Sequence, residues 1–250
     1  MSIENPDSPR VPLRSVTAAR GLEWITESWA LFMKMPGLWI VLTLIVFGIS
    51  MVCGVVPLLG SLLSPFVTTL LMSGMMLTAR KLQTTDSMEV ADLFEILSHP
   101  ALKPLLILTL IYVAMLTAAV VLIFAVFGVG GGAIALFGGA MGGENAAVAA
   151  GIGSMLLALL VFLAVLAPML AMYWFAVPLV LFRALEPWLA MKTSLAAVLT
   201  NMLPLLVYGV IAALLVFVAM LPLMLGLLVA MPVLCISWLI SYQDLFEDAP

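Results

Sequence analysis

The sequence predicts an all-α polytopic membrane helix bundle with six transmembrane helices and three amphipathic interfacial helices. The first observation is composition: of 250 residues, 65% are hydrophobic and 9% are charged, and the mean hydropathy is +1.30. A soluble domain has about 45–50% apolar and about 25% charged residues, so this chain must bury its exterior in lipid. The second observation is six apolar segments of membrane-crossing length, and the third is that they place every Lys and Arg on one side.

This composition excludes soluble enzymes, secreted disulfide scaffolds, disordered chains and nucleic-acid-binding modules. The net charge of -4 argues against a nucleic acid partner, because phosphate binding needs clustered cations. The two cysteines, Cys53 and Cys235, lie in apolar runs without a neighbouring Cys or His, so we interpret both as small buried hydrophobes.

The elements follow from the length needed to cross a bilayer, which is about 20 apolar residues for a helix. The segments that meet this length are 37–57, 59–78, 104–127, 155–182, 202–222 and 223–242. The apolar run around the fourth begins at residue 148 and would measure about 50 Å, so its first turns lie outside the hydrocarbon or the helix tilts. Together the segments form one integral membrane domain, 15–246, between a polar N-terminal tail, 1–14, and an acidic tail, 247–250.

Basic residues set the orientation, because Lys and Arg concentrate in cytoplasmic connections. They precede the first segment, or lie between the second and third, or between the fourth and fifth. The nine are Arg10, Arg14, Arg20, Lys34, Arg80, Lys81, Lys103, Arg183 and Lys192. With six crossings all nine fall on one side together with both ends of the chain, so we expect N and C termini in the cytoplasm.

The connection between the third and fourth segments, 128–153, is rich in glycine. Glycine loses the most conformational freedom on ordering, so we expect a flexible outer loop. The pairs Gly128/Gly132 and Gly138/Gly142 also have the small-xxx-small spacing that lets membrane helices approach closely, which leaves helix packing as the alternative.

Amphipathic segments precede the first, third and fifth crossings, and each is expected to lie flat on the cytoplasmic surface. The apolar face of the first is Leu22, Ile25, Trp29, Phe32 and Met33. The second has Asp86 or Ser87 as a helix cap and Pro100 as its end, and the third begins at Glu186 and Pro187. Surface helix, crossing, outer turn and crossing therefore form a unit that occurs three times, and the surface helices offer a docking place for a protein partner.

No Asp, Glu, Lys, Arg or His lies inside a predicted crossing, which makes an ion-coupled carrier difficult to build. Prolines and tyrosines inside the crossings are the remaining candidates for a cavity or a helix break. They are Pro65, Tyr112, Pro168, Tyr173, Pro178, Tyr208 and Pro232. The simpler interpretation is kinked helices that pack on their neighbours, with the tyrosine hydroxyls in interhelical hydrogen bonds.

Asp92, Glu95 and His99 are spaced so that one helix face presents two carboxylates and an imidazole, which is a conceivable divalent-metal site. A solvated face of a surface helix explains the same pattern, and we expect no metal or cofactor. Hydrolase, P-loop and paired-cysteine motifs are absent from the sequence, so no catalytic residue is expected. Asp244, Glu247 and Asp248 are interpreted as a solvated acidic tail, and the alternative is that residues 242–246 dock another protein or return onto the surface helices.

Five segments carry a resemblance to a known group. They are GLEWITESWALFMKMPGLWI (21–40), PLLGSLLSP (57–65), YWFAVPLV (173–180), KTSLAAVLTNMLPLLVYG (192–209) and SYQDLF (241–246). The chain resembles a proteobacterial group of uncharacterised six-span inner-membrane proteins, which is distantly similar to the membrane domain associated with glycerophosphodiester phosphodiesterases. The resemblance implies a bacterial inner membrane and no activity, because the group has no catalytic motif to transfer. This sequence does not contain the phosphodiesterase's soluble catalytic domain, so the resemblance does not imply that chemistry.

These observations together predict a non-enzymatic inner-membrane protein that organises lipid or a partner protein. The alternative is a small transporter or channel for a lipid or apolar solute, acting alone or as an oligomer. A transporter predicts a cavity at mid-depth, lined by the proline breaks and by Tyr112, Tyr173 or Tyr208.

Overall fold

The computed structural model describes residues 12–55 and 59–247, and the regular secondary structure within these ranges is helical. The helices are α1 (Arg20–Phe32), α2 (Pro36–Val55), α3 (Leu59–Thr85), the 3₁₀ helix η1 (Val90–Leu97), α4 (Leu102–Ile123), the π-helical segment η2 (Phe124–Val129), α5 (Gly130–Trp174), α6 (Ala176–Arg183), α7 (Pro187–Thr200), α8 (Met202–Met220) and α9 (Leu227–Phe246). The predicted all-α class is confirmed.

Six helical stretches of the described chain are long and apolar enough to cross a membrane. They are Pro36–Val55, Leu62–Thr85, Leu102–Ile123, Gly151–Arg183, Met202–Met220 and Leu227–Phe246. The chain is therefore a multi-pass membrane protein. Each stretch overlaps one predicted crossing, because apolar length is a local property that the sequence shows directly.

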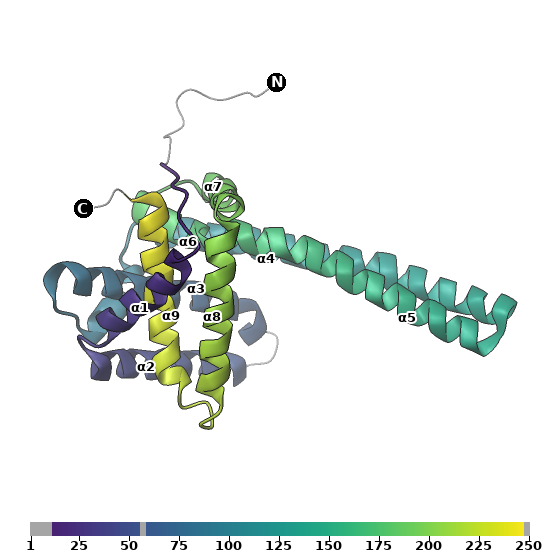
Figure 1. Cartoon of the computed structure of the whole chain (residues 1–250), viewed down its shortest axis with the longest axis horizontal. Helices are drawn as coiled ribbons and strands as arrows, with labels where there is room; N and C mark the ends of the chain where they lie inside the picture. The colour runs from purple at the N-terminus through teal and green to yellow at the C-terminus, as the bar shows by residue number, and fades with distance from the viewer. Residues whose placement is uncertain (1–11, 56–58, 248–250) are drawn as a thin grey trace, which may run out of the picture.

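The crossings are arranged as three hairpins (Figure 1). The chain runs out through α4 and η2 and returns through α5, and this hairpin projects far from the body formed by the other helices (Figure 1). The hairpin of α8 and α9 runs crosswise to that arm (Figure 1). Each hairpin follows one of the short amphipathic elements α1, η1 and α7, so the predicted order of surface helix and two crossings occurs three times.

Helix α9 lies at the centre of the body, where it contacts α1, α2, α3 and α8. Its side chains are buried along most of its length, and Tyr242 and Phe246 are among the largest fully buried side chains. At this end of α9 the N-terminal segment returns, because the Arg14 backbone N–H donates to the Leu245 carbonyl at 3.0 Å. The two ends of the described chain therefore meet at one end of the body.

Helix α1 packs on the protein through a face that the sequence did not predict. Gly21, Trp24 and Ser28 face the protein, whereas Leu22 and Trp29 are 51% and 48% exposed. Of the expected apolar face, Phe32 is buried in the protein and Met33 is exposed, because hydrophobicity does not distinguish a side chain that packs on protein from one available to lipid. Helix α1 therefore has one face against α8 and α9, one exposed apolar face and one charged face.

The other two amphipathic segments differ in how well their beginnings were predicted. Helix α7 begins as expected, with Glu186 as N-cap and Pro187 in the first turn. The cap of η1 is Glu89, and its backbone N–H donates to Asp92 Oδ2 at 2.7 Å. The expected cap at Asp86 or Ser87 was wrong because Asp92 folds back on the Glu89 backbone and fixes a later start.

The expected flexible loop at 128–153 is helical in the structure, as the end of η2 and the first part of α5. The physical reason is that a helix pairs its own backbone polar groups, which an apolar segment needs wherever it leaves water, even where glycine is frequent. A second boundary also differs: α3 continues beyond the predicted residue 78 to Thr85 and carries Arg80 and Lys81 in its last turns.

Candidate functional site

An apolar groove of about 570 Å³ lies between α5, α8 and α9. Leu170 of α5, Ala212 of α8 and Leu234 of α9 stand in its walls. Small residues create the space: Ala167 and Gly209 also line it, and a Cβ added at Gly209 would meet no atom within 4 Å. The volume falls within the range of about 300–1,000 Å³ that is usual for small-molecule sites.

The groove borders a break in the fourth crossing, where α5 ends at Trp174 and α6 begins at Ala176. Ser194 of α7 bridges this break: its Oγ accepts from the Phe175 backbone N–H at 2.8 Å and donates to the Ala171 carbonyl at 2.6 Å. A single hydroxyl therefore satisfies backbone groups on both sides of the break. Such pairing is needed because an unsatisfied backbone group is costly away from water.

The break also explains one of the predicted prolines. Pro178 has no N–H to donate to the Trp174 carbonyl, four residues earlier. The indole Nε1–H of Trp238 donates to that carbonyl instead, at 3.0 Å. The rings of Trp174 and Trp238 lie 5.6 Å apart and both line the groove.

The other polar atoms in the groove wall are also bonded inside the protein. The Tyr208 hydroxyl pairs with Ser237 Oγ at 2.9 Å, and the Cys235 thiol lies 3.9 Å from the Met72 carbonyl that accepts from it. Because these partners belong to the protein, the wall presents rings and aliphatic carbon to a guest.

Tyr208 is the predicted cavity tyrosine that lines this groove. Tyr173 instead meets threonines of α3 and α4: its hydroxyl lies 2.6 Å from Thr69 Oγ1 and 3.3 Å from Thr109 Oγ1. The ring of Tyr112 stacks on that of Tyr173 at 4.2 Å between centroids. Tyr173 therefore joins the arm to α3 through its hydroxyl, as the simpler interpretation expected, whereas Tyr112 connects the two helices of the arm by ring stacking. Neither tyrosine is among the residues that line the groove.

The remaining predicted prolines do not break their helices. Pro65, Pro168 and Pro232 lie inside α3, α5 and α9, which continue through them. Among the described residues that line the groove none is a proline, although Ala167 and Met231 are direct neighbours of Pro168 and Pro232. Only at Pro178 does a predicted proline coincide with a break.

The proposed metal ligands are not brought together. Asp92 is nearly buried and pairs with Lys81 at 2.6 Å, besides capping η1. Glu95 is exposed, and His99 Nδ1 accepts from the Ala101 backbone N–H at 3.2 Å. Within residues 12–55 and 59–247, no group of three His, Cys, Asp or Glu residues is placed to hold a metal ion.

A charged cluster at the end of α9 corrects the prediction of a solvated acidic tail. Asp244 Oδ2 accepts from Arg20 Nε at 2.7 Å and from the Trp24 indole at 2.9 Å. Burial lowers the pKa of the Arg20 guanidinium, but hydrogen bonds to Asp244, Glu23 and Glu27 raise it, and the net shift is upward. Asp244 therefore fixes α1 on α9.

Glu247 also has a partner, since its Oε1 forms an ion pair with Arg80 Nη1 of α3 at 2.9 Å. The same guanidinium lies 4.5 Å above the Phe182 ring. The solvated-tail interpretation was wrong at Asp244 and Glu247, because their partners are about 165 to 225 positions away in sequence, where no local pattern reveals them. The alternative, in which this segment returns onto the surface helices, agrees with the contacts of Asp244 to α1. Asp248 lies outside the described residues.

No family model, no curated protein and no solved structure matches this chain. Function must therefore be inferred from the groove, the charged cluster and the apolar surface.

Proposed function

We propose that this chain is a non-enzymatic protein of the bacterial inner membrane that organises lipid or a partner protein, with both termini in the cytoplasm. The observation that carries the proposal is a separation of surfaces. Helices expose large apolar side chains along their lengths, among them Leu122 of α4 and Leu214 of α8. Charged side chains gather elsewhere: Arg14, Arg80 and Glu247 line one polar pocket at the end of α9.

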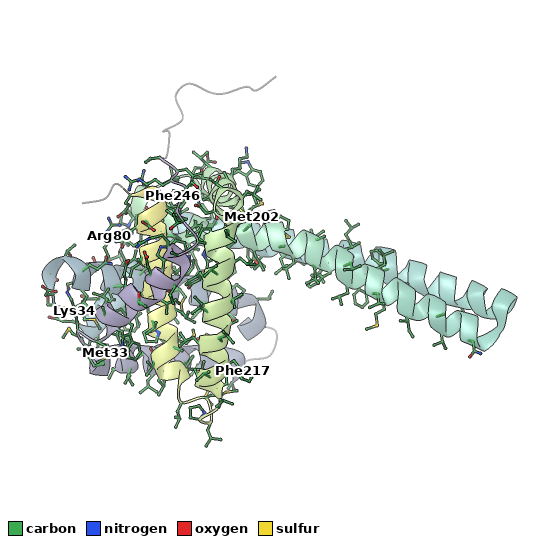
Figure 2. All side chains as sticks on the ribbon, in the orientation of Figure 1. Met33, Lys34, Arg80, Met202, Phe217 and Phe246 are labelled. Carbon is green, nitrogen blue, oxygen red and sulfur yellow. The ribbon has the colours of Figure 1, made fainter. Side chains whose placement is uncertain are left out.

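The two ends of α8 illustrate this separation (Figure 2). Arg80 and Phe246 lie towards the end of the body where α8 begins at Met202, Phe217 lies towards the opposite end, and Lys34 lies between these levels at the side of the body (Figure 2). This distribution agrees with the positive-inside rule if the Arg80 end faces the cytoplasm. The resemblance to a proteobacterial inner-membrane group supports the same assignment.

The non-enzymatic part of the proposal rests on how the ionisable groups are used. Arg20 pairs with Asp244, Lys81 with Asp92, and Arg80 with Glu247. General acid–base or nucleophilic catalysis needs such groups available to a substrate in a pocket. In this protein they pair with one another between helices, and this holds also for Arg20, Asp244, Arg80 and Glu247, which line the polar pocket.

Native purification in a mild detergent tests the lipid-organising role. Mass spectrometry of the intact complex should find a lipid composition enriched over the bulk membrane, or a reproducible partner protein. Recovery of lipid in bulk proportions, with no partner in several detergents, would contradict the proposal.

Photo-crosslinking tests the partner-protein role. A crosslinker in place of Phe94 on η1 or Trp188 on α7 should capture a defined protein, since these side chains are 40% and 43% exposed. The control is the same crosslinker at Leu122 on α4, which should react with lipid.

A transporter or channel for a lipid or apolar solute remains the second candidate, and one observation favours it: Tyr208 lines the groove. Flux of a labelled lipid into proteoliposomes should fall in Tyr208→Phe and in Gly209→Leu if the groove is a transport path. Unchanged flux in both variants would remove this candidate.

A further inference from the structure

We infer that the groove between α5, α8 and α9 is a binding site for one acyl chain of a membrane phospholipid. This inference rests on the proposed function, because it names the class of lipid contact through which the protein acts. It depends on the chemistry of the groove wall, on the volume and on the direction in which the groove opens.

The wall selects hydrocarbon. Trp238 Nε1 and the Tyr208 hydroxyl already have partners in the Trp174 carbonyl and Ser237. A polar guest would therefore leave its own hydrogen-bonding groups unpaired, which costs about 1–3 kcal/mol per group by protein mutational data. An acyl chain has no such groups, and its methylenes gain van der Waals contacts with the wall.

The volume favours a single flexible chain over a helix as the occupant. A single turn of an α-helix, 5.4 Å long and about 10–12 Å wide with its side chains, already fills about 500 Å³. The groove has about 570 Å³, so a helix of a second copy or of a partner could place only about one turn in it. A flexible single chain fits without that limit.

The groove opens sideways from the body. Leu170 and Trp174 line it and are also partly exposed, so its mouth joins the outer surface of the fourth crossing. The fourth crossing is long and apolar enough to span a membrane, and the exposed surface of such a helix meets phospholipid acyl chains. The acyl chain in the groove therefore belongs to a phospholipid of the bilayer.

Tryptophan quenching tests the inference, because bromine on an acyl chain quenches indole fluorescence at short range. The full chain is purified in detergent with Trp29 and Trp188, which are exposed outside the groove, replaced by Phe. Titration with a phospholipid brominated along one chain should give saturable quenching from Trp174 and Trp238, which line the groove.

The test variant is Gly209→Leu, which fills the groove from α8, where a new Cβ meets open space. The matched control is Gly48→Leu on α2, where a Cβ also meets nothing within 4 Å but which does not line the groove. Gly209→Leu should raise the midpoint of quenching at least about tenfold, and Gly48→Leu should leave it unchanged. If Gly209→Leu does not fold, Ala167→Leu fills the groove from α5 and decides the question.

Non-saturable quenching, or equal midpoints in Gly209→Leu and Gly48→Leu, would overturn the inference. Quenching by a brominated fatty acid and not by the phospholipid would overturn the assigned source. These outcomes are distinguishable from failure of the proposed function. If lipid enrichment in native purification persists in Gly209→Leu, the proposed function stands and the acyl-chain site in the groove is rejected. If the groove binds phospholipid saturably but native purification recovers lipid in bulk proportions and no partner, the site stands and the proposed function is rejected.

Discussion

The contact between α1 and α8 depends on the absence of a side chain at Gly21. A Cβ added there would lie 2.4 Å from the Pro204 carbonyl oxygen and 2.8 Å from the Tyr208 backbone nitrogen. Both atoms belong to the backbone of α8 and cannot rotate away. Gly21→Ala must therefore push α1 away from α8, and this weakens the packing of Trp24 against the Tyr208 ring, whose centroids are 5.9 Å apart.

The size of the effect follows from two opposing contributions. Alanine is favoured over glycine inside a helix by up to about 1 kcal/mol. Overpacking of a well-packed contact costs about 1–3 kcal/mol. The net expectation for Gly21→Ala is a loss of up to about 2 kcal/mol, which corresponds to a melting temperature lower by up to about 8 °C at roughly 2–4 °C per kcal/mol.

Gly37→Ala is the matched control. Gly37 is the second residue of α2 as Gly21 is the second residue of α1, and its added Cβ would meet nothing within 4 Å. It should keep the propensity gain and melt at or slightly above the wild type. Thermal unfolding is followed by tryptophan fluorescence in one detergent at one scan rate, because membrane proteins often unfold irreversibly. A Gly21→Ala protein that melts with or above Gly37→Ala would refute this account of the α1–α8 contact.

The remaining predictions concern charge, the helix break and topology. Asp244→Asn should lower the melting temperature, because it removes a partly buried carboxylate that accepts two hydrogen bonds. Asp86→Asn, at an exposed ion pair, should change the melting temperature little. Equal effects of the two substitutions would contradict a stabilising role of the charged cluster. Ser194→Ala should cost about 1–3 kcal/mol by orphaning backbone groups at the break, and wild-type stability would show that the bridge is dispensable. In a cysteine-free background, Arg10→Cys and Pro250→Cys should both be labelled from the cytoplasmic side only, and labelling from opposite sides would overturn the topology.

Local features of the sequence determined the secondary structure class and the number of crossings. Apolar runs of about 20 residues are contiguous in the chain, so their count needs no knowledge of packing. The start of α7 was equally readable, since Glu186 and Pro187 form a local helix-start signal. The glycine-rich segment shows the limit of this approach, because the cost of glycine in water predicts a loop where the need to pair backbone groups in lipid favours a helix.

The groove, the helix break beside it and the charged cluster were decided by the tertiary structure. Ser194 is 19 positions from Phe175, and Trp238 is 64 positions from Trp174, so no local pattern announces the hydrogen bonds that hold the broken helix. The pairing of Asp244 with Arg20 across 224 positions is hidden for the same reason. Because so many residues of this protein are apolar, hydrophobicity alone shows only which segments are buried away from water. Only the packed helices decide which side chains meet protein, which remain available to lipid, and where a space is left between them.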